Sequence, residues 1–298
     1  MTRFLHPEAR RATIHRNSLL SLQGLSFKCL LIGFLSFFHH SLLAQTKEVF
    51  VTGQATVSDN VTLQQAKNQA LNMARSLAVE QAAGVSVNSA VLLQDSLIVA
   101  ELINTFSFGY LIEEEILSWT GEWTKTNDIK KLGIPIVEIS LRGRVSIPEK
   151  SFYRNYVLDA NLDKKTFQDG EPVTLNLSAR EDLFILVINY TSDNKIIPLY
   201  PNNVRNENIL AKDSTVKLPG PRSEEFTITV HNYPGHVMDT EAFIIFGFQV
   251  DNNTSQISWL DIFPVGKEIE YAHFFKKILQ LPVTWIAQKT LIYNVVSN

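Results

Sequence analysis

Cysteine and histidine are scarce in this 298-residue chain. The only cysteine is Cys29, and four of the seven histidines lie within the first 40 residues. The sequence has no Gly-x-Ser-x-Gly elbow, no Walker phosphate-binding loop and no His-Glu-x-x-His metal motif. These absences exclude a catalytic thiol and a disulfide framework for everything that follows residue 29, and they exclude the common short hydrolase and zinc motifs.

An apolar run from Cys29 to Leu43 follows five basic residues. Its length of about 15 residues is short for a membrane-spanning helix, which needs about 20, and is typical of the apolar core of a signal peptide. Ala44 supplies a small residue at the cleavage point. We therefore expect residues 1–44 to be a signal peptide cleaved after Ala44. A retained N-terminal anchor is the alternative. Because the basic part before the apolar run is long, translation could also start at a codon after Met1.

An exported chain without cysteine fits a bacterial envelope better than a eukaryotic secretory route, in which disulfides are common. Residues 45–298 carry 22 basic and 29 acidic side chains, a net charge of −7. A mildly acidic chain is a poor candidate for binding nucleic acid or an anionic membrane surface. We expect a mature protein in the periplasm or at the outer-membrane periphery, with no transmembrane span after the leader.

The first part of the mature chain, residues 47–148, has the pattern of an α+β domain. Strands are expected over 49–57, 110–123 and 134–147. The last of these alternates apolar and polar residues, which is typical of an antiparallel strand with one buried and one solvated face.

Two helices are expected between the first and second strands. The first begins at a capping box formed by Thr62 and Gln65 and ends at Gly84, which suits a left-handed C-cap. Its apolar face is predicted from helical spacing to consist of Leu63, Ala66, Ala70, Met73 and Leu77. The second helix is expected over 95–106. This order predicts two helices on one face of an antiparallel sheet.

Three segments of this part carry a family resemblance. They are Val51–Ala55 (Val-Thr-Gly-Gln-Ala), Ala78–Val85 (Ala-Val-Glu-Gln-Ala-Ala-Gly-Val) and Phe108–Leu111. On these residues the domain resembles the N-terminal domain of flagellar assembly protein T, and a related pattern occurs in small outer-membrane lipoproteins. The resemblance implies an envelope assembly or structural module rather than an enzyme, with envelope proteins as its unidentified partners and a possible outer-membrane association.

The second part, residues 150–298, follows a boundary at Pro148 and is rich in short β-runs. Leu183–Tyr190 is apolar on both faces and is predicted to be a central strand. Several short strands separated by Gly, Pro and Asn turns predict a mainly β, sandwich-like domain. Near the end, the spacing of Tyr271, Phe274, Phe275 and Leu279 predicts a short amphipathic helix before a last strand over 284–296.

This half also resembles a known family. Asp169–Val173 (Asp-Gly-Glu-Pro-Val), Asp182–Val187, Ile197–Asn202 (Ile-Pro-Leu-Tyr-Pro-Asn) and Asn208-Ile209 are similar to the bacterial family called domain of unknown function 4384. The resemblance implies an exported accessory or recognition domain whose ligand is undefined.

Few residues suggest chemistry. His231 and His236 flank a turn and could share a metal ion, although surface loop positions are the simpler interpretation. Glu113–Glu115 places alternate carboxylates on opposite strand faces, so a solvated edge is expected rather than an acid–base pair. We predict no catalytic residue, no cofactor and no metal site.

Aromatic residues offer the only candidate binding surface. Trp119, Trp123, Trp259 and Trp285 lie in β-rich stretches and either line a sugar-binding platform or pack inside the protein. Tyr200 to Asn202 follows a strand and is either a binding loop or a structural turn. The candidate binding residues are therefore Tyr200, Asn202 and Trp259.

Three functions remain open at this point. The first is a non-enzymatic envelope protein that acts as an assembly or interaction module. The second is a carbohydrate- or peptidoglycan-binding periplasmic protein, with Trp259, Asp251 and Asn252 at the site. The third is an exported hydrolase, which would need carboxylates clustered in a cleft.

Overall fold

The structure is a computed structural model, and it describes a defined subset of the chain. The described residues are 45–59, 61–85, 99, 102, 105–106, 108–123, 135–148, 157–204, 208–220 and 226–297. The predicted signal peptide over 1–44 lies outside them, as do the side chain of Trp123 and the segment after the predicted boundary at Pro148. Ala44–Asn298 forms one compact unit. No helix of the described residues has the length and apolar character needed to cross a bilayer.

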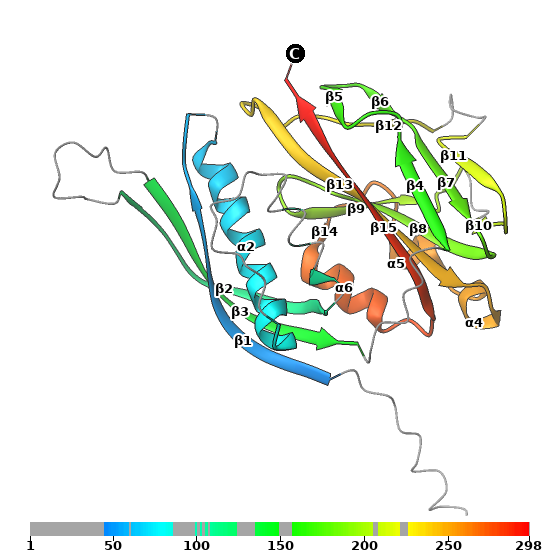
Figure 1. The fold of residues 1–298 in the computed structure, drawn as a ribbon, viewed down its shortest axis with the longest axis horizontal. Coiled ribbons are helices and arrows are strands. Elements are labelled where there is room, and N and C mark those ends of the chain that lie inside the picture. The colour runs from blue at the N-terminus through cyan, green and yellow to red at the C-terminus, as the bar shows by residue number, and fades with distance from the viewer. Residues whose placement is uncertain are drawn as a thin grey trace, which may run out of the picture. The chain divides into compact units, whose positions relative to one another are not determined.

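The first half contains the predicted antiparallel sheet. Its strands are β1 (Gln45–Thr56), β2 (Tyr110–Trp123) and β3 (Pro135–Ile147), and β3 pairs with both others, giving the order β1-β3-β2. Helix α2 (Leu63–Ala83) lies along one face of this sheet (Figure 1). The alternation predicted for β3 is confirmed, because Val137, Leu141 and Val145 are buried while Arg142 and Arg144 are exposed.

Both ends of α2 form as the sequence predicted. The side chain of Thr62 accepts from the backbone N–H of Gln65, the side chain of Gln65 accepts in return from the backbone N–H of Thr62, and Gly84 adopts the left-handed conformation with φ 72°. The predicted second helix lies largely outside the described residues. Within it, Val99, Leu102 and Thr105 are helical.

The predicted apolar face of α2 is partly wrong. The fully buried stripe consists of alanines at every fourth position, namely Ala66, Ala70, Ala74, Ala78 and Ala82. Leu63 is half exposed, and Met73 and Leu77 are only partly buried. Ala66 and Ala70 were predicted correctly, whereas Leu63, Met73 and Leu77 do not belong to the fully buried stripe. Because the stripe consists of alanines alone, the helix backbone can approach the sheet closely.

Gly53 of β1 makes that close approach possible. A Cβ atom at this position would lie 2.1 Å from the carbonyl oxygen of Ala70 and 2.5 Å from the backbone nitrogen of Ala74. Since both are backbone atoms of α2, no side-chain rotation relieves the overlap. Glycine is therefore the residue that fits between strand and helix here.

The second half is built on a seven-stranded sheet. Its order is β14-β9-β8-β13-β15-β5, with β10 also paired to β8. All its pairs are antiparallel except that of β15 with β5. The strands are β5 (Thr166–Gln168), β8 (Leu183–Tyr190), β9 (Lys195–Tyr200), β10 (Ile209–Leu210), β13 (Met238–Gln249), β14 (Ile269–Glu270) and β15 (Trp285–Val296).

Smaller sheets and three helices complete this half. One sheet has the order β11-β7-β4 and another pairs β12 with β6. The bounds are β4 (Leu158–Leu162), β6 (Pro172–Val173), β7 (Leu175–Ala179), β11 (Thr215–Leu218), β12 (Ile228–Thr229), α4 (Asn252–Ser255), α5 (Trp259–Ile262) and α6 (Tyr271–Leu279).

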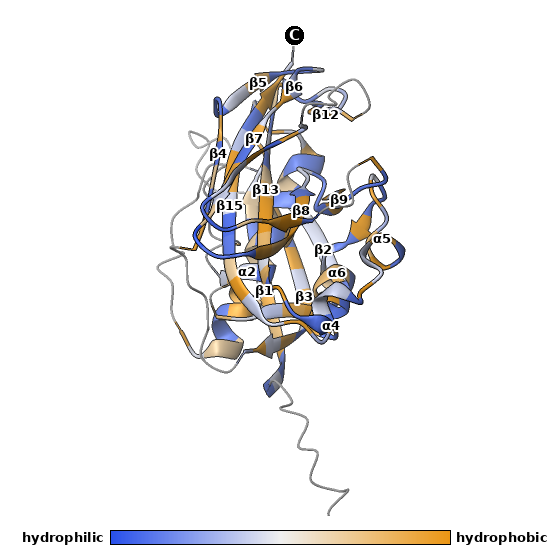
Figure 2. Cartoon of the chain, turned by 90° about the vertical axis from the view of Figure 1, so that its right-hand side faces the viewer, coloured by the Kyte–Doolittle hydropathy of each residue, from blue (hydrophilic) through white to orange (hydrophobic). Residues whose placement is uncertain are grey.

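The large sheet is covered on both faces. On one face, side chains of β8 and β13 share a hydrophobic cluster with those of the sheet β11-β7-β4. On the other face, β8 and β13 share a second cluster with α5, α6 and residues of the first half. Figure 2 shows the hydrophobic residues running along β8 and β13. The α+β class is confirmed and the second half is mostly strands, while its sandwich-like arrangement stays a prediction.

Helix α6 joins the two halves. Its buried residues Tyr271, Phe274, Phe275 and Ile278 pack between β2 and the large sheet. The ring of Phe275 stacks on that of Tyr110 at the start of β2, with centroids 5.0 Å apart. One continuous hydrophobic cluster thus contains residues from both predicted domains, and the division at Pro148 stays a prediction.

We expect Gly53→Ala to lower the free energy of unfolding by about 2 kcal/mol or more, because the added methyl overlaps the backbone of α2. Urea denaturation measures the change. The matched control is Gly121→Ala in β2, where a Cβ meets no atom within 4 Å and stability should not fall. Equal losses in the two variants would contradict the close packing of α2 on β1.

Candidate functional site

The guanidinium of Arg75 on α2 is a buried charge, with a side chain that is 2 % exposed. Its Nε and Nη2 atoms donate to the two carboxylate oxygens of Glu114 on β2, at 2.8 and 2.7 Å. The guanidinium also lies 4.4 Å from the centroid of the Tyr271 ring on α6. Burial lowers the pKa of Arg75, but Glu114, Tyr190 and Tyr271 together outweigh this effect and raise the pKa. Arg75 is therefore permanently charged.

Tyr190 extends this contact to the large sheet. Its hydroxyl accepts from Arg75 Nη1 at 3.1 Å and has two acceptors for its proton, Asn72 Oδ1 at 2.5 Å and Asn194 Oδ1 at 2.9 Å. Burial raises the pKa of Tyr190 to about 12. These groups, which we call the Arg75 cluster, are Asn72, Arg75, Glu114, Tyr190, Asn194 and Tyr271.

The Arg75 cluster has the geometry of a structural crosslink. Perturbed pKa values can mark active sites, but structural ion pairs perturb them too. Here the guanidinium is saturated by its neighbours, and Tyr190 is held neutral at any physiological pH. Asn68 strengthens the same contact, since its side chain donates to the carbonyl of Ser192 at 2.9 Å. The cluster joins α2 to the β8–β9 turn.

The large sheet also contains a buried carboxyl. Glu241 on β13 accepts from the Tyr293 hydroxyl at 2.6 Å and from Asn189 Nδ2 at 2.8 Å. Burial raises the pKa of Glu241, and the two hydrogen bonds oppose that rise. Because three strands contribute to this contact, it fixes the register of β8, β13 and β15.

The two candidate histidines do not converge. His231 Nδ1 lies 3.3 Å from Asp169 Oδ1, whereas His236 Nδ1 lies 2.7 Å from Asp239 Oδ1. Each histidine thus has its own carboxylate, and no group of three or more His, Asp, Glu or Cys with metal-binding spacing occurs in the described part of the chain.

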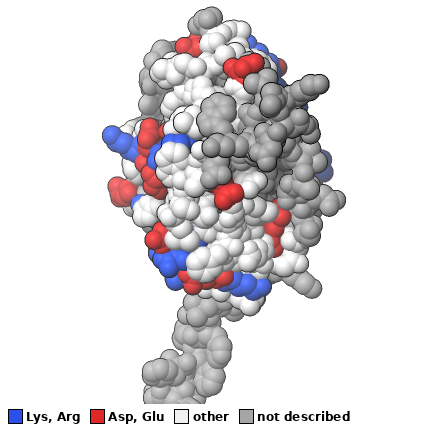
Figure 3. All heavy atoms as spheres, turned by 90° about the vertical axis from the view of Figure 1, so that its left-hand side faces the viewer, with Lys and Arg blue, Asp and Glu red and all other residues white. Residues whose placement is uncertain are grey.

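The predicted alternation of Glu113–Glu115 is confirmed, but the predicted solvated edge is only partly so. Glu113 and Glu115 face outward and pair with Arg144 and Arg142, while Glu114 faces α2 and belongs to the Arg75 cluster. Figure 3 views the side of the molecule on which β1–β3 lie and shows acidic and basic side chains gathered at its lower end. Since cations neutralise these carboxylates, they do not form an acid–base pair.

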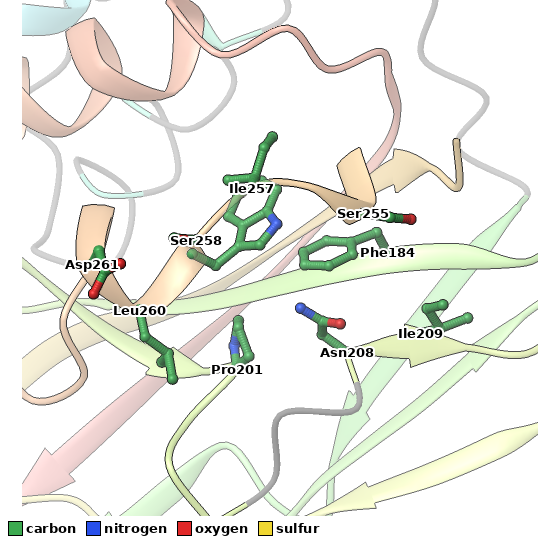
Figure 4. Close-up of a pocket in the computed structure, with 10 residues that line it drawn as sticks. Phe184, Pro201, Asn208, Ile209, Ser255, Ile257, Ser258, Leu260 and Asp261 are labelled. Carbon is green, nitrogen blue, oxygen red and sulfur yellow. The ribbon is translucent and has the colours of Figure 1, made fainter. Parts of the chain in front are cut away.

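A further candidate site is a cavity of about 530 Å³ beside the start of β8. We call it the Phe184 pocket. One side is formed by Pro201, Asn208 and Ile209, and the other by the segment that contains α4 and α5. Figure 4 shows Phe184 between these two sides. The lining residues of the second side are Ser255, Ile257, Ser258, Trp259, Leu260 and Asp261.

The pocket combines an apolar interior with a polar rim. Phe184 stacks on Trp259 with centroids 4.5 Å apart, and Ile209 is about half exposed. The rim carries Asn208, Ser258 and Asp261, and Asp261 is the only ionisable lining residue among those described. Apolar lining with a few polar groups is the usual character of a binding pocket.

Two predicted site residues, Tyr200 and Asn202, flank Pro201, which lines the pocket. Both residues are buried. Asn202 makes turn hydrogen bonds, donating to the carbonyl of Leu199 at 3.4 Å and accepting from the N–H of Val204 at 3.1 Å. Asn202 thus stabilises the turn that follows Pro201, and a binding role for Tyr200 and Asn202 stays a prediction.

The tryptophans differ in exposure. Trp259 is 4 % exposed and packs on Phe184 and Phe248, and Trp285 packs on Tyr110. Trp119 is 53 % exposed, but Lys67 Nζ lies 3.5 Å from its ring centroid. A shared platform of tryptophans is therefore not formed by the described side chains.

We expect Arg75→Met to lower the free energy of unfolding by about 3 kcal/mol or more, because it leaves the largely buried Glu114 carboxylate without its cation. Arg75→Lys should lose less, since a lysine keeps the charge but not the bidentate geometry. Urea denaturation provides the measurement.

The control for this prediction is Arg144→Met, which breaks an exposed pair with Glu113. It should cost less than about 1 kcal/mol. Similar losses for the Arg75 and Arg144 variants would show that the Arg75 cluster does not hold the halves together.

Comparison with known proteins identifies part of the second half. A family described as a domain of unknown function (DUF4384) matches residues 166–238, from β5 to the first residue of β13. The predicted resemblance of the second half is confirmed for this stretch. Nothing in the comparisons supports the resemblance of residues 47–148 to flagellar assembly protein T, which stays a hypothesis. No curated protein matches the chain.

Proposed function

We propose that this chain is an exported, non-enzymatic protein of the bacterial envelope that acts as an assembly or interaction module. The observation that carries the proposal is the Phe184 pocket, an apolar cavity of about 530 Å³ with the half-exposed Ile209 at its side. We propose that an apolar side chain of a partner protein inserts there, in contact with Ile209 and Leu260.

The chemistry of the lining supports binding rather than catalysis. Acid–base and nucleophilic catalysis need at least two reactive groups within hydrogen-bonding reach of each other. Of the described lining residues, only Asp261 ionises, and the remaining polar groups are two hydroxyls and one amide. Such groups recognise a ligand by hydrogen bonding around an apolar contact.

Part of the pocket comes from the DUF4384 stretch and part from outside it. Phe184, Pro201, Asn208 and Ile209 lie within residues 166–238, whereas α4 and α5 follow later in the chain. The resemblance of the first half to flagellar assembly protein T, as a hypothesis, points to assembly of an envelope structure, for which a partner-binding cavity is suited.

A carbohydrate or peptidoglycan ligand is the second candidate. Phe184 and Trp259 line the pocket together with Asn208 and Asp261, which are the residue types that bind sugars. However, each of the two rings is about 4 % exposed and stacks on the other, so neither presents a free face. Asp251 is also engaged, because it accepts from the N–H of Thr254 at 2.8 Å as the cap of α4. A protein partner is therefore the better proposal.

We expect the protein recovered from the periplasmic or outer-membrane fraction to begin at Gln45, the first residue of β1. Removal of residues 1–44 leaves the sheet intact, since β1 starts directly after Ala44. Intact-mass spectrometry of the cell-fractionated protein tests this, and a mass that includes the leader would indicate a retained anchor instead.

A photo-crosslinking amino acid placed at Ile209 should capture a defined set of envelope proteins in living cells, because the side chain lies at the pocket and is exposed. Mass spectrometry of the crosslinked species identifies them. The matched control is the same amino acid at Val237, which is also an exposed apolar residue and does not line the pocket.

Capture at position 209 but not at 237 supports the proposal. The same proteins at both positions, or none at 209, would count against the pocket as the partner site. Retention on purified cell-wall sacculi with no protein crosslink would favour the glycan alternative.

A further inference from the structure

We propose that the Phe184 pocket selects a basic peptide segment, in which an apolar side chain enters the cavity and an adjacent lysine or arginine binds Asp261. The inference rests on the proposed function of this pocket and specifies the chemistry of the partner. Two observations support it. The pocket rim carries the negative charge of Asp261, and the side chains of Asp261, Ser258 and Asn208 have unused hydrogen-bonding capacity.

Asp261 is one of several exposed carboxylates that have no basic partner among the described residues, and it is the one that lines the pocket. Glu113, Glu115 and Glu171 each have a lysine or arginine partner within the protein. The carboxylate of Asp261 has no such partner among the described residues, and it lies on α5 at the edge of an apolar cavity. A lysine or arginine of a bound ligand could therefore form an ion pair with the Asp261 carboxylate.

Two other rim side chains are also unengaged. Ser258 precedes α5 but makes no side-chain capping hydrogen bond. The side-chain amide of Asn208 makes no hydrogen bond to the described residues, although its backbone carbonyl accepts from the N–H of Ile185 at 2.8 Å. Figure 4 shows Asn208 on one side of Phe184 and Ser258 on the other. A peptide backbone lying between them has both donors and acceptors to use.

Charge complementarity favours a basic occupant over an acidic one. Among the described residues, no lysine, arginine or histidine lines the pocket. The chain after residue 44 also carries a net charge of −7, which attracts basic segments and repels acidic ones at a distance. An apolar segment that carries a carboxylate would place two like charges together at Asp261.

The test uses three peptides that share an apolar part and differ in charge. They are N-acetylated and C-amidated Leu-Phe-Lys, Leu-Phe-Gln and Leu-Phe-Glu. Each is titrated into the mature protein, and ¹H–¹⁵N NMR spectra follow the backbone amide signals of Asn208 and Asp261. The lysine peptide should bind about three- to five-fold more tightly than the glutamine peptide at low salt, because an exposed ion pair adds a modest free energy. The glutamate peptide should bind most weakly.

Two variants make the test specific. Asp261→Asn should remove the difference between the lysine and glutamine peptides, because it keeps the side-chain shape and removes the charge. Asp163→Asn removes an exposed carboxylate that does not line the pocket, and it should leave the difference unchanged. Raising the salt concentration should reduce the preference in the unmodified protein.

The outcomes separate this inference from the function it rests on. Equal binding of all three peptides at the pocket signals would overturn the charge selectivity and leave the pocket as a docking site. No change of the Asn208 and Asp261 signals with any peptide, even at millimolar concentration, would overturn the basic-peptide inference. Crosslinking at Ile209 then decides separately whether a partner docks at all.

Discussion

The Arg75 cluster is the contact on which the arrangement of the two halves depends. A buried guanidinium is tolerated only when its charge and its donors are satisfied, and Arg75 achieves this with groups from three elements, β2, β8 and the helix α2 itself. Hydrophobic packing of α6 between the halves is not directional. The bidentate pair with Glu114 and the hydrogen bond to Tyr190 are directional contacts. They therefore fix the position of α2 relative to β2 and β8.

The same arrangement explains where a cavity can form. Both faces of β8 and β13 are covered, so most of these two central strands is inaccessible to a ligand. At the start of β8 the cover is made by the short helices α4 and α5 rather than by α6 or the first half. Trp259 packs onto Phe184 from that side, but the neighbouring Ile209 stays half exposed. The Phe184 pocket is thus the place where the cover of the sheet is incomplete.

Local signals in the sequence predicted local structure well. The predicted ranges of β2 and β8 agree with the structure, and the capping box at Thr62 and the C-cap at Gly84 both form, because each depends on residues close together in the chain. The apolar face of α2 was partly mispredicted because it depends on residues that are far apart in the chain. Asn72 and Arg75 are buried against Tyr190, over 100 residues away, and helical periodicity cannot show that polar residues have a distant partner.

The candidate site shows the same limit more sharply. Tyr200, Asn202 and Trp259 were candidates for a binding surface, with interior packing or a structural turn as the alternative. All three are buried, and the exposed lining residues near them include Ile209 and Asp261. Trp259 packs tightly against Phe184 and Phe248, and this packing holds the neighbouring residues in position. In the proposed function, the Phe184–Trp259 stack would act on binding indirectly, by holding Asp261 and Ile209 at fixed positions on opposite sides of one cavity.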